Sequence, residues 1–439
     1  MNLKMQRNSK LPLTVAGYCF FLAVVALPAT LSGQDTLTLP ESYRLAEQNY
    51  PLAGQVELLS ASNSLKIKNL NKNYLPQLTV NGQATWQSDV TQVEIQLPPP
   101  LPAPEMPVIS KDMYKVTFDI SQSVWDGNVT RYQKKVETMN LQVDQTNIQA
   151  QLYQLKERVN QYFLVVVLLN ENEKLLNSTK SQLQEKLGEL EAGILYGAVL
   201  QSAADALRAE LISLDQRLDE LRIERSTAYH MLSDFLSSDI PETTILALPE
   251  ALIDDPAWEN RRLENEVFNL QQTRLGIMRN MVTTKWNPKF YLFGQGGIGR
   301  PGLNMLSNNF EPFGIVGIKA TWIPWNWNAN KNEKKILELQ SGIVKTQQSA
   351  FDRNLKVQSD RDLGEIRKAR AVLGKDREII DLREKISDAA SHQLDNGVIT
   401  SSDYVNRLTE ERQAKLNYEI HRIQLIKAQL AYLFNQGKL

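Results

Sequence analysis

The chain has 439 residues, enough for several ordinary domains or for one large elongated domain. Charged residues make up 23% and aromatic residues 8%, which excludes both a disordered chain and a uniformly apolar one. The formal net charge is −1, and a chain without a basic excess lacks the electrostatic footprint of a nucleic-acid-binding protein. We therefore expect no nucleic-acid partner.

The first 33 residues have the order of a secretory signal peptide. Three basic residues precede an apolar run over 11–27, and small residues follow up to Gly33. A membrane anchor is the alternative, but a long polar chain opens at Gln34, which favours cleavage near Gly33. Cleavage would remove Cys19, the single cysteine. The mature protein is then expected to form no disulfide and no thiolate metal site.

The sequence pattern of each half of the remaining chain predicts a helix, two strands and a long helical hairpin. In the first repeat, over 34–240, we expect a helix at 41–75, strands at 78–97 and 111–125, and a hairpin at 129–236. A link with prolines follows at 241–255. In the second repeat, over 256–439, we expect a helix at 256–286, strands at 289–299 and 313–325, and a hairpin at 328–435.

Three short matches between the halves indicate this internal twofold repeat. The first pairs Tyr74-Leu75-Pro76 with Trp286-Asn287-Pro288, 212 residues later. The second pairs Trp125-Asp126-Gly127 with Trp325-Asn326-Trp327, 200 residues later. The third pairs Leu190, Gly193 and Ile194 with Leu394, Gly397 and Val398, 204 residues later. Each match is weak, but the three share one order. The first half is longer between its first two landmarks, and that interval holds the proline-rich stretch 98–104. Because such a stretch cannot lie inside a sheet, it is expected to be a loop.

The hairpin helices carry the spacing of coiled coils. Apolar residues recur at alternating intervals of three and four from Leu152 to Leu169 and from Leu207 to Leu221. The proline-free stretch 129–192 would be roughly 96 Å long at 1.5 Å per residue. The helices therefore predict a rod, and taken alone they would favour an ordinary cytosolic coiled coil.

The expected strands alternate apolar and polar residues, as in the stretches from Leu78 to Gln87, from Tyr114 to Ser121 and from Val316 to Trp322. A soluble sheet with one buried face is the common explanation. Strands of about 10 residues also suit a bilayer when they are tilted. The membrane interpretation is favoured because the helices bury their apolar seams on one another, which leaves little surface to cover these strands.

Tryptophans gather at the strands. Six of the seven lie in or beside the strand regions, namely Trp86, Trp125, Trp286, Trp322, Trp325 and Trp327. The aromatic girdles at the two interfaces of a membrane barrel would place them there. In lipid every backbone polar group must be paired, so such a sheet has to close. Four strands cannot enclose a pore, and closure therefore requires several chains.

Together these elements resemble the TolC-type outer-membrane efflux proteins over nearly the whole mature chain. The resemblance rests on the repeat, on the junctions Tyr74-Leu75-Pro76, Trp125-Asp126-Gly127 and Pro324-Trp325-Asn326, and on Gly193 and Gly397 at the hairpin turns. It implies a mainly α fold with membrane β structure. A long α-helical coiled-coil barrel would continue into a β-barrel shared between three chains, with four strands from each.

The resemblance also implies a homotrimer in outer-membrane lipid that extends into the periplasm. Its hairpin tips would form the gate and contact a periplasmic adaptor (membrane fusion) protein, which links to an inner-membrane pump. Carried to this sequence, the tip and gate residues are Leu190, Gly193, Ile194 and Gly197 in the first repeat and Leu394, Gly397, Val398 and Asp403 in the second. Glycine suits a tight turn that needs positive φ. Asp403 matches an aspartate of the family's gating network, whose tyrosine and arginine partners are missing from the second tip.

The sequence patterns that could indicate catalysis or cofactor binding lack the neighbouring residues or spacing that such sites need. The stretch 294–299 fits the dinucleotide-binding G-x-G-x-x-G pattern, but Pro301, Gly302 and Asn304 follow where a helix is needed. The three histidines, His230, His392 and His421, share no metal-ligand spacing. We therefore expect no enzyme, no cofactor and no metal.

Two functions remain from the sequence. The first is the outer-membrane channel subunit of a tripartite efflux pump or type I secretion system, a passive conduit for export. The alternative is a soluble periplasmic coiled-coil scaffold whose short sheet is a docking module.

Overall fold

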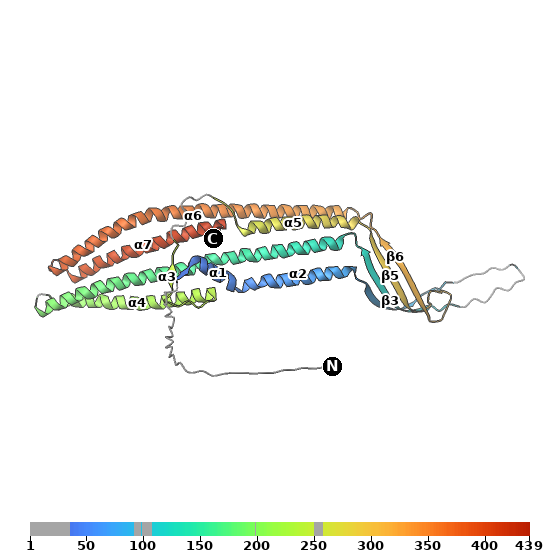
Figure 1. Ribbon diagram of the computed structural model, residues 1–439, viewed down its shortest axis with the longest axis horizontal. Coiled ribbons are helices and arrows are strands. Elements are labelled where there is room, and N and C mark those ends of the chain that lie inside the picture. Colours follow the sequence, from blue (N-terminus) through green and yellow to red (C-terminus); the bar gives the residue numbers. More distant parts are fainter. Residues whose placement is uncertain (1–35, 92–97, 99–107, 198, 250–257) are drawn as a thin grey trace, which may run out of the picture.

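The computed structural model describes residues 36–91, 98, 108–197, 199–249 and 258–439. The expected signal peptide (1–33), most of the proline-rich stretch, residues 250–255 of the link and the first two residues of the second repeat lie outside these ranges. The described chain is elongated, with long helices along most of its length and one antiparallel sheet near the end opposite the hairpin turns (Figure 1). It is mainly helical.

Two long helical hairpins form the rod. The first consists of α3 (Val129–Leu195) and α4 (Gln201–Leu236), and the second of α6 (Ala329–Asp395) and α7 (Ser401–Gln436). The long helices have 67 residues each and the return helices 36 each. Equal lengths at one constant offset of 200 make the two hairpins structural repeats.

Shorter helices continue the line of each return helix towards the sheet (Figure 1). These are α2 (Gln55–Asn71), which packs on α3, and α5 (Leu263–Thr283), which packs on α6. Short 3-10 turns, Lys72–Tyr74 and Thr284–Trp286, lead from them into the sheet. No helix in the described ranges is long and apolar enough to cross a membrane.

The first helix differs from the single helix expected at 41–75. It is divided into α1 (Leu39–Asn49), a 3-10 turn (Pro51–Gly54) and α2. Pro51 explains the break, because the residue before a proline is driven out of the helical region, and Tyr50 has ψ 133°. In the second repeat the helix expected from 256 begins at Leu263, since Arg262 is still extended.

The sheet has the strand order β2-β3-β5-β6, with every neighbouring pair antiparallel. Its strands are β2 (Gln77–Trp86), β3 (Asp112–Trp125), β5 (Lys289–Arg300) and β6 (Glu311–Thr321). The strand expected at 78–97 therefore ends at Trp86, and the one expected at 313–325 ends before Pro324. A separate parallel pair, β1 (Thr36–Thr38) with β4 (Ile245–Ala247), joins the start of the first repeat to the link.

The junction from β3 to α3 fixes the sheet on the rod. Gly127 and Asn128 both have φ 73°, and a Cβ at Gly127 would lie 2.9 Å from the Asn287 side chain. The carboxylate of Asp126 accepts hydrogen bonds from the backbone N–H groups of Asn128 (3.0 Å) and Thr130 (2.7 Å). These bonds satisfy free donors of the first helical turn, so the turn and the helix start are determined together.

Apolar residues of the predicted seams form the core of the rod. Near the middle of the rod, Val159, Phe163 and Leu232 are fully buried together with residues of α1. Near the tips, Leu183, Leu207, Leu214 and Leu218 pack with Tyr404 and Leu408 of the second hairpin. Burial of each such leucine contributes about 2 kcal/mol, so the hairpins are held together along their length.

Candidate functional site: the two-faced sheet and the hairpin tips

One face of the sheet is apolar and uncovered. The strand register places on it Leu78, Val80, Tyr114, Val116, Phe118, Ile120, Leu292, Ile298, Val316 and Ile318. These side chains are exposed, up to 87% for Val316. The charges on this face within the described strands are Arg300 and Asp112, which form an ion pair at the end far from the helices. An apolar face made of ten exposed side chains requires a protein partner or a lipid phase to cover it.

The opposite face is polar and hydrogen-bonded across strands. Asp119 accepts from Asn81 Nδ2 (2.6 Å), from Thr117 Oγ1 (2.8 Å) and from Gln295. Lys115 on the same face donates to Gln295 Oε1 at 3.4 Å. A carboxylate with three donors is satisfied without help from outside the sheet. The alternation read from the sequence therefore describes the sheet correctly.

The tryptophans are unequally distributed between the ends of the sheet. Trp86 ends β2 at the far end, whereas Trp125, Trp286, Trp322, Trp325 and Trp327 lie at the end that joins the helices. Trp322 Nε1 donates to the Trp286 carbonyl at 3.0 Å, and Trp325 and Trp327 pack edge to face. Trp125 is half-buried, whereas the other five are exposed, up to 84% for Trp327. The girdle assignment stays a prediction.

The positions of the two hairpin turns show that the pairing of Gly193 with Gly397 is wrong. Gly197 (φ 73°) and Gly397 (φ 68°) occupy the turns, at the constant offset of 200. Gly193, expected at the first turn, lies inside α3, where a Cβ would meet Val199 Cγ2 at 2.7 Å. The match at offset 204 was therefore wrong by one helical turn. Only a residue at positive φ closes a helix into such a tight turn, and Gly193 is not in that conformation.

The other expected tip residues fall into two groups. Leu190 and Leu394 are buried in the tip core, where they pack with Leu207 and Tyr404, so they support the tips and do not form their surface. Ile194 is half-buried, and Val398 is 70% exposed. The exposed apolar surface of the first tip comes instead from Leu195, Tyr196 and Leu200.

Asp403 has a local partner that the sequence comparison did not consider. Its carboxylate accepts from the backbone N–H of Thr400 at 3.1 Å, and the Thr400 hydroxyl accepts from the Asp403 N–H at 3.2 Å. This reciprocal pair is a capping box at the start of α7. These hydrogen bonds hold the pKa of Asp403 below its usual range. The structure thus gives Asp403 a capping role.

Lys186 is a tip residue that sequence reasoning missed. Its ammonium group contacts Asp395 at 2.8 Å and Glu189 at 2.5 Å, and its side chain is only 8% exposed. Burial alone would lower the pKa of Lys186, but hydrogen bonds to Asp395 and Glu189 outweigh it and raise that pKa. Among the ion pairs of the described residues, Lys186–Asp395 is the one that joins the first hairpin to the second.

A recess of about 630 Å³ separates the two tips beside this ion pair. Leu190, Val199 and Ala203 line it from the first hairpin, and Leu394 and Ile399 from the second. Polar residues such as Asp395, Asn396 and Thr400 also line the recess, which opens to solvent between the turns. The tips therefore meet through a short core and one ion pair, and are not closely packed at their extreme end.

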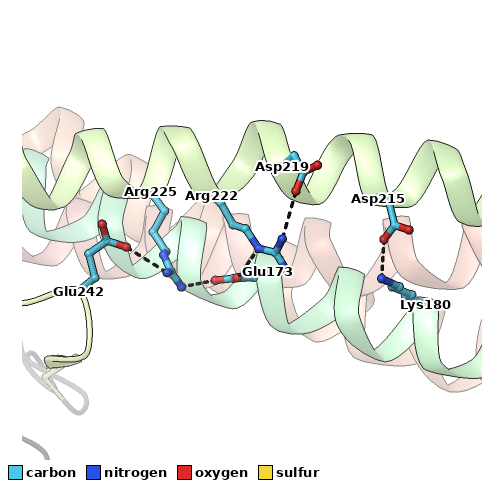
Figure 2. Close-up of polar contacts among 7 residues, drawn as sticks. All are labelled: Glu173, Lys180, Asp215, Asp219, Arg222, Arg225 and Glu242. Carbon is cyan, nitrogen blue, oxygen red and sulfur yellow. Dashed lines mark hydrogen bonds and ion pairs between the residues drawn. The ribbon is translucent and has the colours of Figure 1, made fainter.

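Ion pairs fix the return helix α4 on α3 (Figure 2). Glu173 lies between Arg225, which it binds directly, and Arg222, whose Nε is 3.8 Å away. Arg225 also reaches Glu242 in the link at 3.1 Å. Nearer the tip, Lys180 pairs with Asp215 at 2.5 Å. These pairs flank the leucine seam and set the register of the first hairpin.

Features associated with cofactors have structural explanations. The glycines of 294–299 lie in β5, and a Cβ at Gly297 would overlap the Val116 carbonyl oxygen of the neighbouring strand. Their role is close packing within the sheet. His421 Nδ1 lies 2.6 Å from Asp376 within the second hairpin. In the part of the chain that the structure describes, no group of three or more potential metal-binding side chains occurs.

Comparison with solved structures identifies the fold. The chain aligns with the outer membrane protein VceC of Vibrio cholerae at a TM-score of 0.63 and 11% identity, covering 91% of this chain and 96% of that one. The Campylobacter jejuni outer membrane channel CmeC aligns at a TM-score of 0.61 and 13% identity, covering 98% of this chain and 94% of that one. The outer-membrane channel OprN aligns at a TM-score of 0.64 and 13% identity, covering 91% of this chain and 90% of that one.

No family model and no curated protein matches the sequence. The likeness is thus one of structure, and at this identity it concerns the fold. The chain has the fold of the TolC-type outer-membrane channels, as the ordered set of sequence features indicated.

Proposed function

We propose that the chain is the subunit of a homotrimeric outer-membrane channel that serves as a passive conduit for export. One observation carries this function, namely a four-stranded sheet that is apolar and uncovered on one face, polar on the other, and open at both edges. Such a sheet is incomplete as a single copy, and lipid suits its apolar face.

Closure follows from the hydrogen-bonding requirement at the two edges. Within the described chain, β2 and β6 each pair with one strand only, so each leaves a row of N–H and C=O groups free. These groups cannot remain free in lipid, and pairing of β6 with β2 of the next copy satisfies both edges at once. Three copies supply twelve strands, which is enough to enclose a lumen lined by the polar face.

The helices offer a matching surface for the neighbouring copies. On α6, Ile336, Ile343, Ala350 and Val357 recur every seven residues and are all exposed, while Leu337 and Val344 beside them pack on α5. On α2, Leu58 and Leu65 are exposed with the same spacing. An uncovered heptad stripe is the seam of a coiled coil that lacks its partner helix. A second copy of the chain supplies such a helix.

The tips suit contact with further proteins at the end opposite the sheet. Leu195, Tyr196, Leu200 and Val398 expose apolar side chains there. We infer that they contact a periplasmic adaptor protein, through which an inner-membrane pump supplies the energy for export. The chain itself would catalyse no covalent change. In a periplasmic scaffold, by contrast, the apolar face of the sheet would have no covering phase, and no feature of the described chain favours that alternative.

Membrane extraction tests the channel assignment. Isolated outer membranes extracted with a mild detergent should release a native particle of three chains that heating dissociates. A companion variant, Val316→Asp, places a charge at the most exposed position of the apolar face and should reduce the amount of trimer in the membrane fraction. Recovery of the unmodified chain as a monomer in the soluble periplasm would overturn the assignment and support the scaffold.

The tip assignment needs a separate test. Tyr196→Asp and Val398→Asp place charges on exposed tip positions, which should weaken adaptor binding while leaving the trimer intact. Ile245→Asp, on the exposed edge of β4 far from the tips, is the matched control. Export measured in cells should fall for the tip variants only. Unchanged export with normal trimer levels would remove the tips from the contact surface.

A further inference from the structure

The register of the sheet sorts the charges of its polar face into rows. Of the charged residues on this face, Lys115 and Glu311 lie farthest from the helices, and both lie opposite Gly299 of β5. Asp119 lies near the middle of the sheet. At the end that joins the helices, Lys319 pairs with Tyr291 and Lys289 with Thr321. The basic groups near the helices are therefore diagonal neighbours on one face of β5 and β6.

These two lysines lack a polar partner in the part of the chain that the structure describes. Neither ammonium group forms a hydrogen bond, an ion pair or a cation–π contact among the described residues. Diagonal neighbours on a sheet lie about 7–8 Å apart, so the two charges repel each other. Lys319 is exposed on the polar face. An unpaired like-charge pair adds nothing to the stability of the sheet.

The acidic residues at this end are already engaged. Asp126 accepts from Tyr74 Oη at 2.9 Å and caps α3. Glu333 pairs with Lys285 at 2.6 Å. Asp119, farther along the face, is satisfied by its three donors. The charge of Lys289 and Lys319 is therefore not neutralised locally, and it acts on whatever occupies the space in front of the polar face.

We propose that Lys289 and Lys319 form a cationic ring at the helix end of the barrel lumen, and that this ring favours negatively charged cargo. The proposal rests on the proposed function, because threefold closure turns one lysine pair into a ring of six. The favoured class consists of small solutes with carboxylate, phosphate or sulfonate groups. Lining charges of one sign act on passing ions in this way in pores generally.

The local potential can be measured with charged thiol reagents. Thr321→Cys places a thiol on the polar face directly opposite Lys289. Two ammonium groups within about 7 Å should make a negatively charged methanethiosulfonate react roughly fivefold faster, relative to a positively charged one, than it would without them in 0.1 M salt. The protein used is the full-length trimer in isolated outer membranes.

Two further variants carry the test. In the Thr321→Cys background, Lys289→Gln with Lys319→Gln should reduce the ratio of anionic to cationic labelling rates roughly fivefold. Lys289→Arg with Lys319→Arg keeps the charge and should retain the original ratio. The parent chain without the introduced thiol gives the background labelling.

The outcomes separate this inference from the proposed function. A preference for the anionic reagent that glutamine removes and arginine keeps supports the ring. If both reagents react and the glutamine pair leaves their ratio unchanged, the lumen exists but the lysines do not set its potential, and the inference is wrong. If neither reagent labels Cys at position 321 in the membrane-embedded protein, the polar face lines no aqueous lumen, and the proposed function fails first.

Discussion

Lys186 shows how one side chain can tie two repeats together. Its ammonium group is buried, whereas Asp395 and Glu189 are 41% and 53% exposed. The two sides of the ion pair are therefore not equivalent. Removing the lysine leaves carboxylates that water can solvate, but removing the carboxylates leaves a buried cation without a partner.

We predict that Glu189→Ala with Asp395→Ala destabilises the folded chain more than Lys186→Met does. The double variant should cost about 1–3 kcal/mol because it leaves a buried charge unpaired. Lys186→Met keeps the apolar stem and should cost less than about 1 kcal/mol. Denaturant unfolding of the purified protein measures both. A larger loss of stability for Lys186→Met would mean that the carboxylates, and not the lysine, bear the larger free-energy cost of desolvation.

Asp362 gives a prediction about pH. This carboxylate on α6 is buried, and burial raises its pKa, although the hydrogen bond from Asn435 Nδ2 (2.6 Å) opposes the shift. A raised carboxyl pKa means that the folded state binds the proton more tightly than the unfolded state. Stability is therefore greatest below the unfolded pKa of about 3.9 and falls as the pH rises through the folded pKa.

We expect Asp362→Asn to stabilise the protein at pH 7 relative to the unmodified chain. The asparagine oxygen can still accept from Asn435, while the charge that burial penalises is gone. The difference from the unmodified chain should vanish at about pH 2.5, more than a pH unit below the unfolded pKa, where Asp362 is neutral in both states. Thermal unfolding at the two pH values measures the effect. A destabilised variant at pH 7 would show that the charge itself is needed.

Neither residue could be identified from the sequence. Lys186 lies in a helix rich in charged residues, and nothing in its spacing separates a buried lysine from a solvated one. Its partner Asp395 belongs to the other repeat, 209 positions away. Contacts at this distance depend on how the two hairpins are packed, which periodicity within one helix does not report.

At the scale of elements, sequence patterns predicted the features that depend on residue spacing within one segment. The leucine seams, the alternating strands and the glycine turns all depend on spacing along one segment. The error at Gly193 arose because the tips were matched at offset 204, whereas the tryptophan junctions already gave 200. At that offset Gly197 matches Gly397, and Ser202 matches Ser402. The consistent offset would have placed the first turn correctly.

Alanine substitutions test the corrected turn positions. Gly197→Ala and Gly397→Ala force a Cβ into the left-handed region and should each cost about 1 kcal/mol. Gly188→Ala, inside α3 with open space around it, should instead stabilise the helix by roughly 0.5–1 kcal/mol. Thermal unfolding of the three variants gives the comparison. Equal effects at Gly188 and Gly197 would contradict the turn assignment.

Adjacent residues of β6 test the two faces of the sheet. Val316 lies on the apolar face and Ile315 on the polar face. Val316→Lys should cost about 2–4 kcal/mol if the apolar face lies in lipid, because a charge is then placed at membrane depth. Ile315→Lys should be tolerated, since its side chain would face water. The heat stability of the extracted trimer reports both, and equal losses would contradict the assignment of the faces.

At the scale of the whole molecule, the proposed assembly depends on features that the sequence already indicated. Open sheet edges, an uncovered apolar face and long apolar seams are the observations that support more than one copy in the proposed channel. What the sequence could not supply was the surface between copies, because a heptad pattern on α6 does not reveal which of its faces is already covered. The structure shows that Leu337 and Val344 pack on α5 and that the stripe beside them is free.

That free stripe gives a test of assembly apart from the membrane. Ile343→Lys puts a charge in the middle of the stripe of Ile336, Ile343, Ala350 and Val357, and should cost the interface about 2 kcal/mol or more per subunit. Because Ile343 is 56% exposed in the single chain, its helix content and its unfolding as a monomer should be unchanged. Lys345→Glu, on the other side of the same helical turn, is the control and should leave the trimer intact. Native mass measured in detergent at decreasing protein concentration should show dissociation of the Ile343 variant first. A trimer as stable as that of the unmodified chain would place the subunit interface on another face of the rod.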